Sequence, residues 1–292
     1  MSAPPQNSAP KIAVIGATGM LGVPVTRALI KAGFAVTALV RNAAAAKRAL
    51  PPEVALIAAD VGDVDSLRRG LAGHDALYLS LAIQPGERKG DFHTEAQGLE
   101  HILVAARAVG IKRIGYLSAL VIDSEDGAWW VLDVWRNAVS RLKSSGIPST
   151  VFYASNVMET LPTRHKVGGV MLLAGASHHA NYWIAGADLG AQVARAFQLP
   201  EAAGRDYVMQ GPELVSYEEA AQRYARGNGE ALRILTLPLP LLRFLGLFSV
   251  HMRFNARILR TVLRYPEEFK AADTWRDLGR PTTTIDDFAR GA

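Results

Sequence analysis

Short runs of β-branched and other apolar residues alternate with helical stretches along the first half of the chain. Continuous apolar strands of this kind are typical of a parallel sheet that helices cover on both faces. The pattern therefore predicts an α/β fold with a doubly wound parallel sheet of the Rossmann type. The strands that we expect are Lys11–Gly16, Ala35–Val40, Val54–Ala58, Asp75–Leu81, Arg113–Ser118 and Thr150–Tyr153, and the helices are Val23–Ala32, Val64–Ala72, Glu95–Val109 and Val131–Ser144.

The alternation breaks after the sixth predicted strand. We therefore expect a dinucleotide-binding Rossmann core over residues 11–157 and a smaller C-terminal, substrate-side lobe over residues 158–292. The lobe is expected to be interleaved with the core and to lie over one end of the sheet. The later elements that we expect are helices at Asp188–Phe197 and Ser216–Arg226 and a strand at Arg205–Val208.

The composition narrows the chemistry that the chain can carry. Its 292 residues include no cysteine, which excludes disulfides, thiolate catalysis and zinc or iron–sulfur sites built on cysteine. None of its seven histidines forms an HExxH pair, so we expect no metal. The net charge of +5 suits anionic ligands, but aromatic residues do not interleave with the basic ones, and we expect no nucleic-acid partner. Residues 1–10 are polar and Pro-rich without an apolar run, so we expect a disordered tail and a cytoplasmic protein.

A glycine-rich loop follows the first predicted strand and leads directly into a helix. In this position the first glycine allows a tight turn, the second lets a pyrophosphate approach the backbone, and the third lets the helix pack against the strand. The N-terminus of the helix offers free N–H groups and a positive dipole to phosphates. A turn that serves packing alone is the alternative interpretation. The residues that we expect to bind the dinucleotide here are Gly16, Thr18, Gly19, Met20, Leu21 and Gly22.

The residue that follows the second predicted strand indicates which dinucleotide is bound. An NAD site usually has Asp or Glu about 20 residues beyond the glycine loop, but this chain has Arg41, and its first acidic residue is Glu53. A guanidinium can bind a 2′-phosphate through its planar fork, and Lys47 or Arg48 can add charge. We therefore predict NADP(H) as the cofactor. The alternative is that Arg41 is a surface residue at the end of a strand.

Polar and small residues follow the other predicted strands. Asp60 can accept a hydrogen bond from the adenine amino group while Val61 packs on the ring, although Asp60 can instead be a helix N-cap. Tyr153 is a weak candidate proton donor, for which a buried aromatic side chain is the alternative. Because the carboxyl ends of parallel strands line the ligand crevice, we expect further cofactor contacts from Ser80, Leu81, Ala82, Ser118, Ala119, Tyr153, Ser155 and Asn156.

One late segment, Ile234–Val250, is strongly apolar. A membrane-spanning helix needs about 20 apolar residues with few or no charges, whereas this segment is interrupted by two prolines, an arginine and a glycine. We expect a buried cap helix. The alternative is a contact with a second subunit or with a membrane surface, because arginines recur near helical spacing after the segment.

The chain resembles the atypical short-chain dehydrogenase/reductase superfamily, in particular its NmrA-like NAD(P)-binding branch. The resemblance extends over nearly the whole chain and implies a Rossmann fold, a bound NAD(P) and a reductase or redox-sensing activity. The residues that carry it are Gly16–Gly22, Leu39–Asn42, Asp60–Val61, Ala108–Ser118, Ser145–Thr150, Val157–Glu159, Asp188–Leu189, Gly211–Glu213 with Ser216–Tyr217, and Leu278–Gly279 with Pro281–Phe288.

The chain departs from this superfamily at its usual proton relay. Many members use Tyr-x-x-x-Lys, in which the Lys lowers the pKa of the Tyr so that the phenol can exchange a proton with the substrate. The pair would fall near Val131 and Trp135, and none of the eight tyrosines has a Lys four residues later. Hydride transfer to a conjugated acceptor still needs only orientation and a weak proton donor. Trp129, Trp135 and Met158 are our candidates for a substrate pocket, with core filling as the alternative for the tryptophans.

We therefore expect an NADPH-dependent oxidoreductase that transfers hydride to a quinone or another electron-poor small molecule. Two alternatives stay open at this point. The chain can be a non-catalytic NADP(H) sensor that binds another protein, or a dinucleotide-binding subunit associated with a membrane surface.

Overall fold

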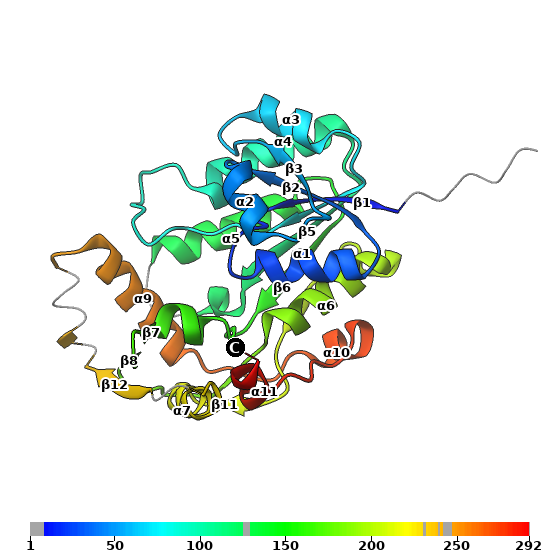
Figure 1. Cartoon of the computed structure of the whole chain (residues 1–292). Coiled ribbons are helices and arrows are strands. Elements are labelled where there is room, and N and C mark those ends of the chain that lie inside the picture. The colour runs from blue at the N-terminus through cyan, green and yellow to red at the C-terminus, as the bar shows by residue number, and fades with distance from the viewer. Residues whose placement is uncertain (1–8, 125–128, 230–231, 239, 242–246, 292) are drawn as a thin grey trace, which may run out of the picture.

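A computed structural model describes residues 9–124, 129–229, 232–238, 240–241 and 247–291 of the chain (Figure 1). The predicted disordered tail therefore lies almost entirely outside the described residues.

The centre of the molecule is a seven-stranded sheet in which every neighbouring pair of strands is parallel. This arrangement confirms the predicted Rossmann-type α/β fold. The last strand comes from the second half of the chain, so the sheet is completed by late residues. In spatial order the strands are β10 (Tyr207–Met209), β6 (Ser149–Ala154), β5 (Arg113–Ala119), β4 (Ala76–Leu79), β1 (Lys11–Ile15), β2 (Ala35–Val40) and β3 (Ala55–Ala58).

Helices cover both faces of this sheet (Figure 1). Each face buries its own hydrophobic cluster, because the strands are apolar on both sides. Helix α1 and helix α6 pack against each other on one face. The helices of that face are α1 (Gly22–Lys31), α2 (Ala43–Ala49) and α6 (Gly186–Gln198), and those of the other are α3 (Val64–Leu71), α4 (Leu99–Val109) and α5 (Trp130–Lys143).

The rest of the chain forms a smaller lobe beyond the carboxyl ends of the strands (Figure 1). It has its own hydrophobic cluster, centred on the fully buried Trp183. Its strands are β7 (Lys166–Val167), β8 (Val170–Ala174) and β12 (Arg233–Leu237), which form one sheet, and β9 (Asn181–Tyr182) and β11 (Leu214–Val215), which form another. Its helices are α7 (Tyr217–Gly227), α9 (Val250–Arg264) and α11 (Ile285–Arg290), whereas α10 (Ala272–Leu278) packs against α6 and β10 of the core. Across the core and the lobe, short helical turns lie at Thr94–Gly98, Leu120–Asp123, Leu161–His165 and Pro200–Ala202.

The buried cap helix that we expected over Ile234–Val250 is wrong for the described part of that segment. Its beginning belongs to strand β12, which pairs in parallel with β8 and exposes four of its five residues. Pro238 ends this strand, since proline has no amide hydrogen to donate to a neighbouring strand. Leu247 and Phe248 are 71% and 77% exposed. No helix in the described part of the chain is long and apolar enough to cross a membrane.

Candidate functional site

The glycine loop between β1 and α1 is folded so tightly that a side chain would not fit at two of its positions. Gly16 has φ +86°, and a Cβ added there would lie 2.0 Å from the carbonyl oxygen of Ser80. A Cβ at Gly22 would lie 2.0 Å from the carbonyl oxygen of Gly16, and the amide of Gly19 donates to that same oxygen at 3.0 Å. No side chain caps the first turn of α1, and that turn has no acidic residue. The positive end of the α1 helix dipole is therefore available to an anion.

A cleft of about 840 Å³ extends from this loop across the carboxyl ends of β4, β5 and β6 to helix α9. On the side of the sheet it brings together many of the residues predicted from the sequence. We call this side the sheet wall. The predicted residues that line it are Met20, Leu21, Leu81, Ala82, Ser118, Ala119, Ser155 and Asn156, together with Trp135 from α5.

Two polar atoms of the sheet wall have no partner in the described part of the chain. The hydroxyl oxygen of Ser118 and the side-chain nitrogen of Asn156 are both buried without a hydrogen bond. Buried polar groups in proteins nearly always find a partner. Since both residues border the cleft, these atoms are suited to the ribose and amide groups of a dinucleotide, and the tight glycine loop is suited to its phosphates.

Other predicted cofactor residues do not line the cleft. Thr18 and Arg41 are exposed, and Arg41 directly follows β2, whose Leu39 pairs with Ile15 of β1 beside the loop. Asp60 does not cap helix α3, because Asp63 accepts the amides of the first turn. An oxygen of Asp60 instead accepts the Gly62 amide at 2.7 Å. The neighbouring Val61 is half-buried, and its carbonyl oxygen accepts a hydrogen bond from Nδ1 of His101 at 2.9 Å.

Three predicted residues lie in hydrophobic packing rather than in the cleft. Tyr153 is half-buried in β6, and burial raises the pKa of its phenol to about 12. Trp129 is 4% exposed and packs edge-on against Phe254, with ring centres 5.5 Å apart. Met158 is 1% exposed in the core of the lobe. The structure therefore places these side chains away from the cleft lining, in contrast to Trp135.

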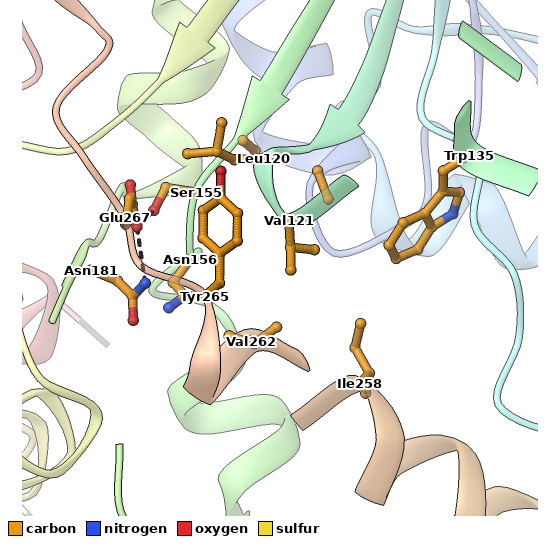
Figure 2. Close-up of a pocket in the computed structure, with 12 residues that line it drawn as sticks. Leu120, Val121, Trp135, Ser155, Asn156, Asn181, Ile258, Val262, Tyr265 and Glu267 are labelled. Atoms are coloured by element: carbon orange, nitrogen blue, oxygen red, sulfur yellow. Dashed lines mark hydrogen bonds between the residues drawn. The ribbon is translucent and has the colours of Figure 1, made fainter. Parts of the chain in front are cut away.

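The opposite side of the cleft is mostly apolar, with Asn255 as a polar member, and comes from the late part of the chain. We call it the helix wall, defined by Met252, Phe254, Ile258, Leu259 and Val262 of α9. Figure 2 shows two of these side chains, Ile258 and Val262, near the ends of β5 and β6. This wall was not expected from the sequence, because the arginines of α9 suggested a contact with a second subunit or a membrane surface instead.

A buried carboxylate ties the lobe to the end of β6, beside a smaller cavity of about 120 Å³. Glu267 accepts hydrogen bonds from Ser155 Oγ at 2.7 Å and Asn181 Nδ2 at 3.0 Å, whose side chains Figure 2 shows beside it. It also accepts Gln210 Nε2 at 2.6 Å and the Tyr182 amide at 3.2 Å. Burial raises the pKa of Glu267, and these hydrogen bonds partly oppose that rise. Four donors on one carboxylate make it a central attachment of the lobe.

A second buried carboxylate, Glu95, lies in the sheet wall beside Trp135. It accepts the Tyr116 hydroxyl at 2.8 Å, the Trp135 indole N–H at 2.8 Å and the Ile83 amide at 3.1 Å. No sequence pattern marks Glu95 as functional, because an acidic residue at the start of a long predicted helix is an ordinary partner of the helix dipole. Burial raises the pKa of Glu95 above its usual range.

Comparisons with known proteins are consistent with this geometry. The model of the NmrA-like family matches residues 8–275. Quinone oxidoreductase 2 of Escherichia coli is 28% identical over 225 residues, which are 75% of each chain. The crystal structure of the Escherichia coli NADPH-dependent quinone oxidoreductase complexed with NADPH superposes with a TM-score of 0.72 at 24% identity, covering 96% of this chain and 99% of that one. The crystal structure of triphenylmethane reductase of Citrobacter sp., complexed with NADP(H), superposes with a TM-score of 0.74 at 19% identity, covering 97% of this chain and 100% of that one.

Proposed function

Since the chain belongs to the NmrA-like family, we propose that it is an NADPH-dependent oxidoreductase that reduces a quinone or another electron-poor small molecule. The observation that carries this proposal is the single cleft that joins the glycine loop to the apolar helix wall. Such a cleft can hold a dinucleotide and a flat apolar acceptor side by side. The similar proteins that act on a quinone or a triphenylmethane dye support the same class of acceptor.

The sheet wall supplies the groups that would hold the cofactor. The backbone of the glycine loop would bind the pyrophosphate at the N-terminus of α1, and Ser118 and Asn156 would bond to the ribose and carboxamide groups. When bound, NADPH supplies the hydride. The remaining contribution of this chain is orientation, because holding two reactants in place can lower a barrier by about 7–11 kcal/mol.

We expect Arg41 to select NADPH over NADH. It is exposed directly after β2, where its guanidinium can form charge-assisted hydrogen bonds with the 2′-phosphate. Such bonds contribute about 1.5–3 kcal/mol each, so Arg41→Ala should weaken NADPH binding about 10- to 100-fold and leave NADH binding nearly unchanged. Calorimetric titration with both dinucleotides measures this. Arg41→Lys is the matched control, since it keeps the charge without the planar fork and should give an intermediate loss. Equal losses for NADPH and NADH would contradict the assignment.

The activity itself is tested by mixing the protein with NADPH and a panel of benzoquinones and naphthoquinones. We expect the absorbance of the reduced nicotinamide to fall at a rate that depends on both the protein and the acceptor. Tight NADPH binding without oxidation across the whole panel would contradict the reductase and favour a dinucleotide sensor. Loss of oxidation in the Arg41→Ala variant at low NADPH, with recovery at high NADPH, would link the activity to the proposed cofactor site.

A further inference from the structure

Glu95 is a buried carboxyl group in the cleft that the proposed cofactor contacts do not use. It is 3% exposed and lies in the sheet wall together with Ala82, Ser118 and Trp135. The residue belongs to a π-helical turn, Thr94–Gly98, that precedes α4. Such turns are rare in proteins and are frequent at functional sites.

The surroundings of Glu95 are unusual for a buried acid, because every donor that bonds to it is neutral. The Tyr116 hydroxyl comes from β5, the Trp135 indole from α5 and the Ile83 amide from the loop after β4. Glu87 disfavours the ionisation of Glu95, and Glu87 itself bonds to Nδ1 of the His93 ring at 2.6 Å. No cation pairs with Glu95 among the residues that the structure describes. A buried carboxyl in this setting is able to keep its proton at pH values where an exposed one has lost it.

A purely structural role does not require an acid here. A glutamine could accept the Trp135 and Ile83 N–H groups through its oxygen and donate its amide to Tyr116. It would do so without the cost of burying a charge. The carboxyl group is also close to the gap in the proton relay, because Trp135 stands where the Lys of a Tyr-x-x-x-Lys pair would fall and its indole bonds directly to Glu95.

We propose that Glu95 is the proton donor to the reduced acceptor, an inference that rests on the proposed reductase function. After hydride addition a quinone carries a negative oxygen. The O–H bond of the Glu95 carboxyl breaks, a new O–H bond forms on that oxygen, and the product leaves as the neutral hydroquinone. The resulting carboxylate is stabilised by the three donors that already point at it, and it regains its proton from water before the next turnover.

The proton on Glu95 is tested first without cofactor or acceptor. Infrared difference spectra across a pH titration of the wild-type protein should show the C=O band of a protonated carboxyl at pH values where exposed carboxyls are already ionised. The Glu95→Gln variant should lack this band and keep the same far-ultraviolet circular dichroism. If the wild-type protein shows no band that the substitution removes, the proposal is overturned.

The kinetic test uses NADPH and a benzoquinone. General-acid catalysis typically contributes 10²- to 10⁴-fold, so Glu95→Gln should lower kcat by about 100-fold and leave the Kd for NADPH within about 2-fold. Because the donor acts only when protonated, wild-type kcat should fall as pH rises through its pKa, and this alkaline limb should be absent in the variant. Trp135→Phe removes a donor that lowers the pKa of Glu95, so its alkaline limb should move to higher pH.

The outcomes separate the two proposals. If the wild-type protein oxidises NADPH with the quinone and Glu95→Gln keeps its kcat and pH profile, Glu95 is not the donor while the reductase stands. If Glu95→Gln does not fold, the pH dependence of kcat in Trp135→Phe is the deciding measurement. If its kcat falls at the same pH as that of the wild-type protein, the proposal is overturned. If the wild-type protein itself does not oxidise NADPH, the proposed function fails and the donor role fails with it, even where the infrared band is present.

Discussion

The two walls of the cleft are built in different ways. The sheet wall depends on backbone geometry, since its glycine loop leaves no space for a Cβ at Gly16 or Gly22, and its other groups lie at strand ends in a fixed register. The helix wall depends on side-chain volume, because it consists of aliphatic and aromatic groups on one side of α9. A single substitution in the glycine loop should therefore abolish NADPH binding, whereas a single substitution in the helix wall should weaken acceptor binding only moderately.

The walls also differ in how they are held in place. The sheet wall rests on a parallel sheet with a hydrophobic cluster on each face. The helix wall belongs to the lobe, where β12 is largely exposed and the Glu267 hydrogen bonds link the segment after α9 to the sheet. The lobe therefore combines its own hydrophobic clusters with a polar attachment at Glu267, whereas the sheet is held between two hydrophobic clusters.

The strongest test of this contrast is Gly16→Ala. Its φ of +86° costs an alanine about 1–2 kcal/mol, and the added Cβ would also clash with the backbone of Ser80. We expect NADPH binding to be lost and the free energy of unfolding to fall by more than the dihedral cost alone. Denaturant unfolding and calorimetric titration measure the two effects.

Gly33→Ala is the matched control for this substitution. Gly33 has nearly the same φ, +89°, but no atom lies within 4 Å of the position of an added Cβ. It should therefore lose only about 1–2 kcal/mol of stability and keep its NADPH affinity. If both variants bind NADPH equally well, the loop does not act as a phosphate-binding turn.

The sheet wall was predictable from the sequence because its signals are local. A glycine triplet directly after an apolar strand specifies a turn, and strand ends specify a crevice, without knowledge of any distant contact. Helix α2 was missed because its Ala-rich sequence has no apolar period, although Asn42 accepts the Ala45 amide as an N-cap at 3.0 Å. The sequence therefore predicted the order of strands and helices better than it predicted the number of helices.

The helix wall and Glu95 were not predictable for a different reason. Ile258 faces the cleft only because the lobe folds back over the sheet, across a separation of more than 100 residues from Trp135. Glu95 becomes a buried acid only through contacts with Tyr116 and Trp135, which come from other elements. Long-range packing of this kind leaves no periodic trace in a single sequence.

The second test concerns the attachment of the lobe. Glu267→Ala removes the acceptor of four part-buried hydrogen bonds, although Gln210 Nε2 also donates to the Glu268 carbonyl oxygen. Unsatisfied buried groups cost about 1–3 kcal/mol each before relaxation and hydration offset part of that cost, so we expect a loss of about 3 kcal/mol in the free energy of unfolding. Glu268→Ala, at the exposed neighbouring position, should change stability by less than about 0.5 kcal/mol. Equal effects in denaturant unfolding would show that the Glu267 cluster does not hold the lobe.

The smallest effect is expected in the helix wall. Ile258→Ala removes apolar surface from the cleft lining and should cost about 1 kcal/mol of acceptor binding, which corresponds to about a fivefold rise in KM for a naphthoquinone. The Kd for NADPH should stay unchanged, because Ile258 lies across the cleft from the glycine loop. Leu235→Ala, at a position in β12 that is 51% exposed, is the control and should change neither constant. If Ile258→Ala weakens NADPH and quinone to the same extent, the two walls do not bind separate ligands, and the contrast between a backbone-built and a side-chain-built site is wrong.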